Sequence, residues 1–334
     1  MKRNGAVEDM AERRKARRVE SKGEASEGLY GDVEEMGVHA QWIEGLATCG
    51  YVVVPRFLTD EELKMLREES DLLVETTHED PKRAVECIIE QGCVVDMMAD
   101  CPMEDASPAR VEADAYLTAR RKELGRRCQR HSPPKAIPEG SSDVLKKLLF
   151  ERLPYLARLL WRRPATPPAR QDLFFFNEHY VVKPPQTEAE FRWHRDDDEQ
   201  LAMCVHRDSI APYLSAWCAL DDISPTNGPL RFVPLQNSSS SHALQPQSIC
   251  SLEEADLEWL DSHATEPVLV HSCDVIVFRS DIWHCSSQNA SERIRRAFYA
   301  QYSQEPITAR PCESNPLSFA IPCGSSTSFP TIED

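Results

Sequence analysis

Hydrophobic positions near the N-terminal end of the recognisable fold follow a strand pattern and then a helical one. The β-branched run Tyr51–Val54 predicts a strand, and a proline follows it directly. Thr59 stands three positions before Glu62, which is the spacing of a helix capping box. Apolar residues at 63, 66, 72 and 73 then recur at helical spacing. We therefore expect a short strand followed by an amphipathic helix.

The pattern stays helical in much of the chain up to residue 165. Residues 141–161, SSDVLKKLLFERLPYLARLLW, predict a helix with an interruption at Pro154. Residues 80–140 give a helical pattern only around 111–128. This half of the chain is therefore predicted to be largely helical.

After residue 168 the periodicity changes to short apolar or alternating runs, with Gly, Pro, Asn and Ser between them. Short strands with turn signals between them favour an all-β sandwich or barrel over parallel βαβ units. The predicted fold is mainly β with flanking helices, around a jelly-roll core. The runs are 173–183, 213–223, 230–235, 267–280 and 295–303.

These patterns predict one folded domain between two tails. Residues 1–36 are polar and charged, as in a disordered tail or a frayed helix. We place the domain at 37–310, with a helical insert at about 80–165 and a β core at about 170–305. Residues 311–334 are predicted to be a C-terminal tail.

Charge and cysteine content narrow the classes of function. With 38 basic against 55 acidic residues, the net charge of -17 argues against nucleic acid or an anionic membrane as the main partner. The 12 cysteines include no C-x-x-C pair, which disfavours a zinc finger or a thioredoxin-like site. The charged N-terminus does not resemble a signal peptide, and no run reaches the ~20 apolar residues of a membrane span. We expect a cytoplasmic protein with reduced thiols.

The stretch FRWHRDDDEQ, residues 191–200, contains the first candidate chemistry. In an extended chain His194 and Asp196 point to the same face, so that both can bind one metal ion. Asp197 then points away, and Asp198 shares the face but lies further out. We expect the extra aspartates to face solvent or a cation-bearing loop.

A second histidine, His284, follows a buried-strand pattern ninety positions after His194 (284 minus 194). Two histidines and one carboxylate, with coordination positions left open, form the facial triad of non-heme Fe(II) oxygenases. Zinc would suit the two histidines equally well. A third interpretation also stays open, in which His194 lies on the surface and His284 packs in the core.

Arg295 lies in the last apolar run, on the same predicted face as Arg293, Ala297 and Tyr299. A buried arginine needs an anionic partner, and its guanidinium binds a carboxylate through two hydrogen bonds. Arg295 is therefore a candidate for holding a dicarboxylate. A salt bridge on an edge strand would explain it equally well.

Taken together, these motifs resemble the phytanoyl-CoA dioxygenase family of Fe(II)- and 2-oxoglutarate-dependent oxygenases. The stretches that match in the family's order, from about residue 45 to 305, are YVVVPRFLTDEEL, NEHYVVKPP, WHRD, SAWCALDDISPTNGPLRFVP and DVIVFRSDIWHCSSQNASERIRRAFYAQYS. The resemblance implies a double-stranded β-helix, which is a cupin-like jelly roll, with helices on one side.

The resemblance also implies a role for individual residues. His194, Asp196 and His284 match the iron ligands, and Arg295 matches the arginine that binds the distal carboxylate of 2-oxoglutarate. Trp217 matches a position that lines the same co-substrate. His179 and Lys183 fall in the preceding strand, which lines the same pocket, although Lys183 could instead cap the end of the strand.

The implied reaction uses dioxygen and 2-oxoglutarate to hydroxylate or desaturate a small organic molecule, such as a lipid-derived or secondary metabolite. Succinate and carbon dioxide leave, and we expect ascorbate to support activity. A zinc-dependent hydrolase with the same ligands and a catalytically silent jelly-roll binding protein are the alternatives. A halogenase is disfavoured, because Asp196 occupies the position where a halogenase needs a small residue.

Two regions depart from the family pattern and leave the substrate open. The family has a PGSH-like run after NGPL, whereas this chain has PLQNSSSSH. Residues 80–140 carry no motif of the family. Long insertions of this kind are often binding loops. We therefore predict that residues 80–140 and 236–247 are lids that select the substrate.

Overall fold

The computed structural model describes residues 27–77, 88–91, 113–130, 135–161, 172–198, 211–238, 252–307 and 321–324. Contacts divide the chain into two compact units, Met1–Glu44 and Gly45–Asp334. Helix α2 (Glu27–Cys49) crosses this division, so the predicted boundary at residue 36 lies inside a helix. The backbone of 27–36 is thus helical within the segment predicted as a tail.

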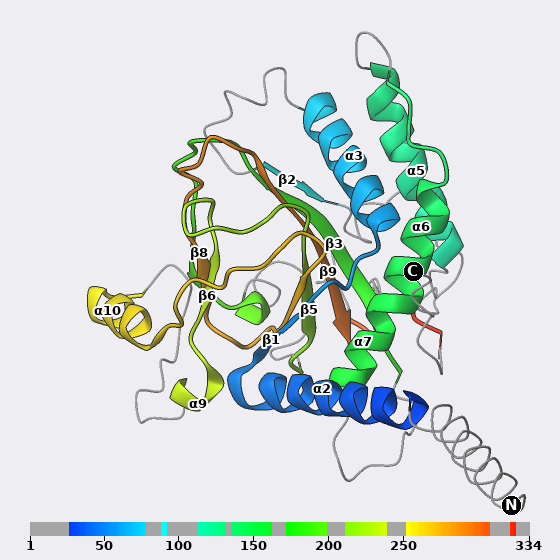
Figure 1. The fold of residues 1–334 in the computed structure, drawn as a ribbon. Coiled ribbons are helices and arrows are strands. Elements are labelled where there is room, and N and C mark those ends of the chain that lie inside the picture. Colours follow the sequence, from blue (N-terminus) through cyan, green and yellow to red (C-terminus); the bar gives the residue numbers. More distant parts are fainter. Residues whose placement is uncertain are drawn as a thin grey trace, which may run out of the picture. The chain divides into compact units, whose positions relative to one another are not determined.

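The second unit contains two antiparallel sheets (Figure 1). The larger sheet has the strand order β1-β7-β5-β9-β3-β10, and β2 also pairs with β3. Its strands are β1 (Tyr51–Val54), β2 (Ile88–Gln91), β3 (Phe174–Lys183), β5 (Leu214–Ala219), β7 (Val275–Arg279), β9 (Arg295–Ser303) and β10 (Ile321–Pro322). All five runs predicted after residue 168 contain a strand. Strands β2 and β10 were not predicted; they fall in the expected helical insert and in the expected tail.

The smaller sheet has the order β4-β8-β6 and packs face to face on the larger one. Its strands are β4 (Phe191–His194), β6 (Leu230–Phe232) and β8 (His284–Ser286). Phe232 of the smaller sheet contacts Tyr51 and Phe278 of the larger one, with ring centroids 4.5 and 5.3 Å apart. A buried apolar cluster that includes Trp217, Ile276 and Phe232 fills the space between the sheets. This double-sheet arrangement confirms the predicted jelly-roll core.

Helices cover the outer face of the larger sheet, on the α3 side of Figure 1. They are α3 (Asp60–Thr77), α5 (Ala113–Arg130), α6 (Ser141–Lys147), a π-helical turn η2 (Leu148–Arg152) and α7 (Leu153–Leu160). Tyr116 of α5 and Phe150 of the π-turn pack edge-on against Phe175 of β3. The helix is not broken at Pro154 as predicted. The irregular part is the π-turn before it, and Pro154 occupies the first turn of α7, where a proline is tolerated.

The capping box predicted for α3 is present. The backbone N–H of Glu62 donates to Thr59 Oγ1 over 3.2 Å, and the backbone N–H of Thr59 donates to Glu62 Oε2 over 2.9 Å. Two of the helix's otherwise unsatisfied groups are satisfied in this way. Two further short helices, α9 (Leu235–Ser238) and α10 (Glu254–His263), follow β6 in sequence.

A buried ionic cluster connects the outer helices to β3. Arg120 of α5 donates to Glu69 of α3 and to Glu178 of β3. Tyr116 donates to Glu178, and Tyr180 donates to Glu69 over 2.8 Å. Burial raises the pKa of Glu178, although the charge of Arg120 opposes that shift. The cluster fixes the outer face of β3, while the alternate residues of the strand face the other sheet.

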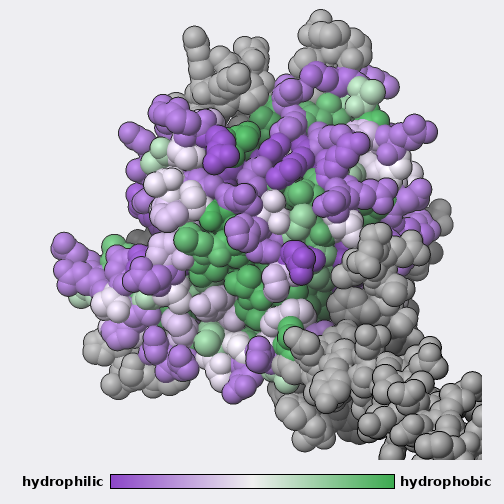
Figure 2. Space-filling view, in the orientation of Figure 1, coloured by the Kyte–Doolittle hydropathy of each residue, from purple (hydrophilic) through white to green (hydrophobic). Residues whose placement is uncertain are grey.

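Hydrophilic residues cover most of the described surface in Figure 2, and a group of hydrophobic residues lies near the middle of the face shown. Within the described ranges, the large hydrophobic side chains that are well exposed are Val38, Leu257 and Leu269. None of the helices that the structure describes is long and apolar enough to cross a membrane.

Candidate active site

The two predicted histidine ligands lie opposite one another in the smaller sheet. His194 ends β4, His284 begins β8, and the two are direct cross-strand partners. Their ring centroids are 4.1 Å apart. Each ring holds its Nδ1 against a carbonyl two residues earlier, at 2.7 Å from Arg192 O and 3.1 Å from Ile282 O. Because a carbonyl only accepts, Nδ1 carries the proton in both rings and Nε2 is left as a metal ligand.

Asp196 brings one carboxylate oxygen to these two nitrogens. Its Oδ1 lies 3.5 Å from His284 Nε2 and 3.9 Å from His194 Nε2. The three ligand atoms all lie within 4.8 Å of one another. The structure thus brings these three predicted residues together, but the local geometry differs from the expectation. Asp196–Asp198 form a helical turn rather than extended chain, so the turn delivers the carboxylate.

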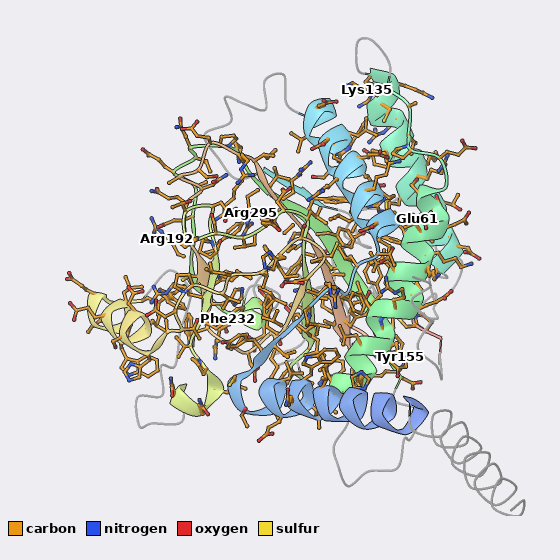
Figure 3. All side chains as sticks on the ribbon, viewed as in Figure 1. Glu61, Lys135, Tyr155, Arg192, Phe232 and Arg295 are labelled. Atoms are coloured by element: carbon orange, nitrogen blue, oxygen red, sulfur yellow. The ribbon has the colours of Figure 1, made fainter. Side chains whose placement is uncertain are left out.

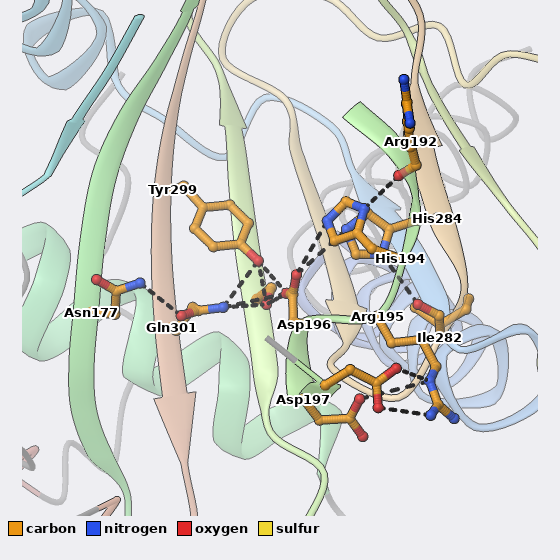
Figure 4. A network of polar contacts seen from close by, with 12 residues as sticks. Asn177, Arg192, His194, Arg195, Asp196, Asp197, Ile282, His284, Tyr299 and Gln301 are labelled. Carbon is orange, nitrogen blue, oxygen red and sulfur yellow. Dashed lines mark hydrogen bonds and ion pairs between the residues drawn. The ribbon is translucent and has the colours of Figure 1, made fainter. Parts of the chain in front are cut away.

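The other oxygen of Asp196, Oδ2, accepts hydrogen bonds from three side chains (Figure 4). Ser215 Oγ lies 2.7 Å away, Gln301 Nε2 lies 3.3 Å away, and the Tyr299 hydroxyl also donates to it. Sequence reasoning assigned none of these three a role. Alternation along the last strand does place Tyr299 and Gln301 on the face of Arg295, and that was the available signal.

Asp197 and Asp198, the remaining aspartates of this stretch, lie beside the guanidinium of Arg195. Both oxygens of Asp198 accept from Arg195, each over 2.8 Å. Burial raises the pKa of Asp197 to about 7; Asp198 and Asp281 add to the shift, and Arg195 opposes it. The cation beside these aspartates is therefore Arg195, which directly follows His194 in the sequence.

The protonation states suit a metal site. Burial lowers the pKa of His284 to about 4, and neighbouring His194 lowers it further while Asp196 opposes the shift. The ring is therefore neutral at pH 7, as a metal ligand must be. Burial and the charge of Asp196 raise the pKa of Tyr299 well above its ordinary value, so its hydroxyl keeps the proton that it donates.

Arg295 lies inside the β core, between the two sheets (Figure 3). It is 1% exposed, and its Nη2 donates to Gly228 O over 2.7 Å. Its guanidinium carbon lies 4.8 Å from the centre of the Trp217 ring. The structure thus brings together Arg295 and Trp217, the two residues expected to contact 2-oxoglutarate. Arg296 points the other way and binds Asp221, as the alternation predicts.

Lys183 is the direct cross-strand partner of Arg295. It is fully buried, and its Nζ donates to Ser286 Oγ over 2.8 Å, to Ser286 O over 3.2 Å and to Ser287 O. Two basic side chains therefore extend from facing positions of β3 and β9. Ser286, which sequence reasoning did not single out, joins this group from β8.

His179 lies on the same inner face of β3 and packs against Tyr299, with ring centroids 4.6 Å apart. The residue is half-buried, and part of it stays accessible to solvent. This burial lowers the pKa of His179 to about 4, against a smaller opposing effect of Asp196. His179 is thus a neutral side chain beside the ligand cluster.

The family model for phytanoyl-CoA dioxygenase (PhyH) matches residues 47–297 of this chain. The chain belongs to the phytanoyl-CoA dioxygenase family. This confirms the resemblance drawn from the sequence motifs and makes the protein an oxidoreductase of the 2-oxoglutarate-dependent dioxygenase type.

Two solved structures show the same fold at low sequence identity. The carbocyclase SnoK from nogalamycin biosynthesis, described as non-heme and alpha-ketoglutarate-dependent, is 18% identical over 81% of this chain and 86% of its own, with a TM-score of 0.50. The epimerase SnoN, solved with Fe3+, alpha-ketoglutarate and nogalamycin RO, is 19% identical over 87% of this chain and 97% of its own, with a TM-score of 0.51. A search of curated proteins found no match.

The residues of this phytanoyl-CoA dioxygenase family member fit an iron ion. Two neutral imidazoles with fixed Nδ1 protons and one carboxylate oxygen converge, which is the donor set of the facial triad. The described part of α5, by contrast, packs on the outer face of the larger sheet and does not cover this site. Strand β2, which also falls in the first predicted lid, pairs with β3 of the larger sheet. Residues 80–87, 92–112, 131–134 and 239–247 of the predicted lids lie outside the described residues.

Proposed function

We propose that this protein uses Fe(II) and 2-oxoglutarate to hydroxylate or desaturate a small organic molecule, with release of succinate and carbon dioxide. The observation that carries the proposal is the convergence of Asp196 Oδ1 on the Nε2 atoms of His194 and His284. Family membership supports it, because the match includes all three residues.

His194, Asp196 and His284 would hold the metal. When bound, iron would supply the activation of dioxygen, coupled to oxidative decarboxylation of the co-substrate and to oxidation of the substrate. The chain's own contribution is to orient these three groups. Hydrogen bonds to the carbonyls of residues 192 and 282 hold the rings, so little rearrangement is needed when the metal binds.

Arg295 and Lys183 support the assignment of a dicarboxylate co-substrate. Like charges at facing positions of neighbouring strands are destabilising, and burial increases that cost. A carboxylate beside them would offset it. Arg295 would bind the distal carboxylate, Trp217 would pack under the guanidinium, and Lys183 with Ser286 would line the pocket.

The spacing along β9 is compatible with this arrangement. Tyr299, which contacts Asp196, and Arg295 are four residues apart on one face, so their Cα atoms lie roughly 13 Å apart along the strand. The arginine side chain spans part of this distance, and a five-carbon dicarboxylate would occupy the remainder. One end of the co-substrate would then face the arginine and the other the metal ligands.

Aromatic residues exclude water on one side of the ligands. The rings of Phe278 and Phe232 lie 4.8 and 6.0 Å from the ring of His284. Exclusion of water by these aromatic rings strengthens electrostatic interactions within the site. On the other side, Asn177, His179 and His194 are partly exposed and uncharged groups predominate. We propose that the substrate approaches from this side.

The test is a reconstitution of the metal-free protein with Fe(II), ascorbate and labelled 2-oxoglutarate, across a library of small metabolites, with succinate as the readout. We expect succinate from the parent protein and none from His194→Ala or His284→Ala. His271→Ala, which changes a histidine whose side chain is 88% exposed, is the matched control and should behave as the parent.

Two results would contradict the proposal. The first is full succinate formation by His284→Ala. The second is a parent protein that forms no succinate from 2-oxoglutarate with iron but hydrolyses a library member with zinc, because zinc suits the same three ligands. Circular dichroism of each variant separates loss of a ligand from loss of the fold.

A further inference from the structure

We infer that Ser215, Tyr299 and Gln301 form a positioning device, here called the Asp196 cradle, which holds Asp196 so that only Oδ1 is offered to the metal. Asn177 sets the orientation of the cradle through Gln301. This inference rests on the proposed function, because it requires a metal at His194, Asp196 and His284.

The cradle surrounds one oxygen of one carboxylate. Its members come from the inner faces of two neighbouring strands, β5 and β9, and are 0%, 6% and 2% exposed in the order Ser215, Tyr299 and Gln301. All three donate to Asp196 Oδ2. Hydrogen bonds to an ionised acceptor are about twice as strong as neutral ones, and burial strengthens them further.

The members of the cradle also orient one another. Gln301 Nε2 lies 3.1 Å from the Tyr299 hydroxyl and 3.2 Å from Ser215 Oγ. The Tyr299 hydroxyl lies 2.7 Å from Ser215 Oγ. Each hydroxyl directs its single proton at Oδ2, and the two amide protons of Gln301 are shared among three acceptors, Asp196 Oδ2 and the two hydroxyl oxygens. Removal of one member therefore disturbs the other two.

Asn177 determines which end of the Gln301 amide faces the carboxylate. Asn177 Nδ2 donates to Gln301 Oε1 over 2.9 Å (Figure 4). An amide oxygen only accepts, so this bond turns the Gln301 oxygen away from Asp196 and its NH2 group toward it. Without that bond the amide could rotate and place its oxygen against the carboxylate, which would repel it. The sequence of contacts runs from β3 through β9 to the metal ligand.

The consequence for the metal is a single carboxylate contact. With three donors on Oδ2, the lone pairs of that oxygen are engaged, whereas Oδ1 faces both imidazole Nε2 atoms. A ligand held in this way loses little freedom on binding and leaves more coordination positions open. Loss of a hydrogen bond to a metal ligand typically lowers metal affinity about 10- to 100-fold.

Tyr302 provides a matched control for Tyr299. It lies on the same strand but faces the other side of the sheet, it is 1% exposed, and its hydroxyl donates to Leu149 O over 2.8 Å. Tyr299→Phe and Tyr302→Phe therefore each remove one buried hydroxyl and the hydrogen bond that it donates, and Tyr299→Phe also removes the one accepted from Gln301. A purely structural role would give the two variants the same effect on metal binding.

The experiment measures Mn(II) binding to the metal-free protein, with electron paramagnetic resonance of the unbound ion as the readout and no turnover required. We expect Tyr299→Phe and Gln301→Leu to weaken Mn(II) binding at least about 10-fold, and Tyr302→Phe to leave it within about twofold of the parent. Equal affinities for Tyr299→Phe and the parent would overturn the inference, as would an equal loss in Tyr302→Phe. Ser215→Ala provides the same comparison if Tyr299→Phe does not fold.

A double-mutant cycle tests the role of Asn177. If Asn177 acts through Gln301, Asn177→Ala should weaken Mn(II) binding several-fold in the parent and have no effect in the Gln301→Leu background. Additive losses would show that Asn177 does not act through Gln301.

The inference and the proposed function fail in different ways. If the parent and His284→Ala bind Mn(II) equally, the metal site itself is wrongly assigned. If His284→Ala abolishes binding while Tyr299→Phe and Gln301→Leu do not weaken it, the metal site stands and only the cradle is refuted.

Discussion

Gly228 provides a quantitative test of the proposed co-substrate pocket. This residue, in the NGPL stretch, has φ +85°, and its carbonyl accepts the hydrogen bond from Arg295. A Cβ at this position would lie 2.7 Å from Ser287 O and 3.0 Å from Lys183 Cδ. The first contact is with backbone, which does not move as freely as the end of a side chain. Gly228→Ala should therefore disturb both basic residues of the pocket.

The expected loss of unfolding free energy in Gly228→Ala has two contributions. A left-handed conformation costs a non-glycine residue about 1–2 kcal/mol. Overpacking against fixed neighbours typically adds about 1–3 kcal/mol. Gly140→Ala separates them, because Gly140 has φ +74° but no atom lies within 4 Å of its added Cβ. We expect Gly140→Ala to lower the free energy of unfolding by about 1–2 kcal/mol and Gly228→Ala by about 2–5 kcal/mol.

The assay combines urea unfolding of both variants with calorimetry of 2-oxoglutarate binding to the Mn(II)-loaded proteins. Gly228→Ala should weaken 2-oxoglutarate binding at least about 10-fold, since a shift of 1.4 kcal/mol suffices. Gly140→Ala should bind it as the parent does. Equal destabilisation in the two variants together with unchanged binding in Gly228→Ala would refute the reasoning that this glycine shapes the pocket.

Three further predictions concern charged groups. Arg295→Ala should weaken 2-oxoglutarate binding by about 2–5 kcal/mol in calorimetry, and Arg295→Lys should restore only part, because lysine lacks the planar fork; full rescue by lysine would contradict this. Arg120→Met should lower the free energy of unfolding by about 3–5 kcal/mol, because it leaves two buried carboxylates without their cation, whereas Glu178→Gln should cost less than about 2 kcal/mol; the opposite order in urea unfolding would disprove it. The folded-state pKa of His179, about 4, is below the 6.5 of the unfolded chain, so its contribution to stability is complete above pH 6.5 and is lost as pH falls through 4. Relative to His179→Phe, the metal-free parent should therefore lose about 2–3 kcal/mol of unfolding free energy between pH 7 and pH 4.5, and a constant difference would count against it.

The sequence identifies the three residues of the candidate metal site because their signals are local. The H-x-D spacing and the buried strand before His284 identify the residues, and alternation along β9 separates Arg295, which faces inward, from Arg296, which faces Asp221. The capping box at Thr59 is equally local, and it forms as expected.

The parts that sequence reasoning missed depend on register between distant strands. Alternation places Tyr299 and Gln301 on the inner face, but their meeting with Ser215 depends on the pairing of β5 with β9, in which Ser215 lies opposite Gln301. The turn at Asp196 and the contact of Lys183 with Ser286 also depend on tertiary packing. The alternation of side chains along a strand shows which face of the sheet a residue lies on. It does not show which residue of the neighbouring strand lies beside it.

The facing arrangement of His194 and His284 has a consequence for how this protein can diversify. Ninety positions separate the two residues (284 minus 194), yet the backbone pairing of β4 with β8 sets the distance between their rings. Insertions or deletions in the connecting chain need not move either imidazole, and each doubling of a flexible loop adds only about 0.6 kcal/mol of closure cost. The loops between the intervening strands can therefore change in length over evolution, and new substrates can be accommodated while the two imidazoles remain in place.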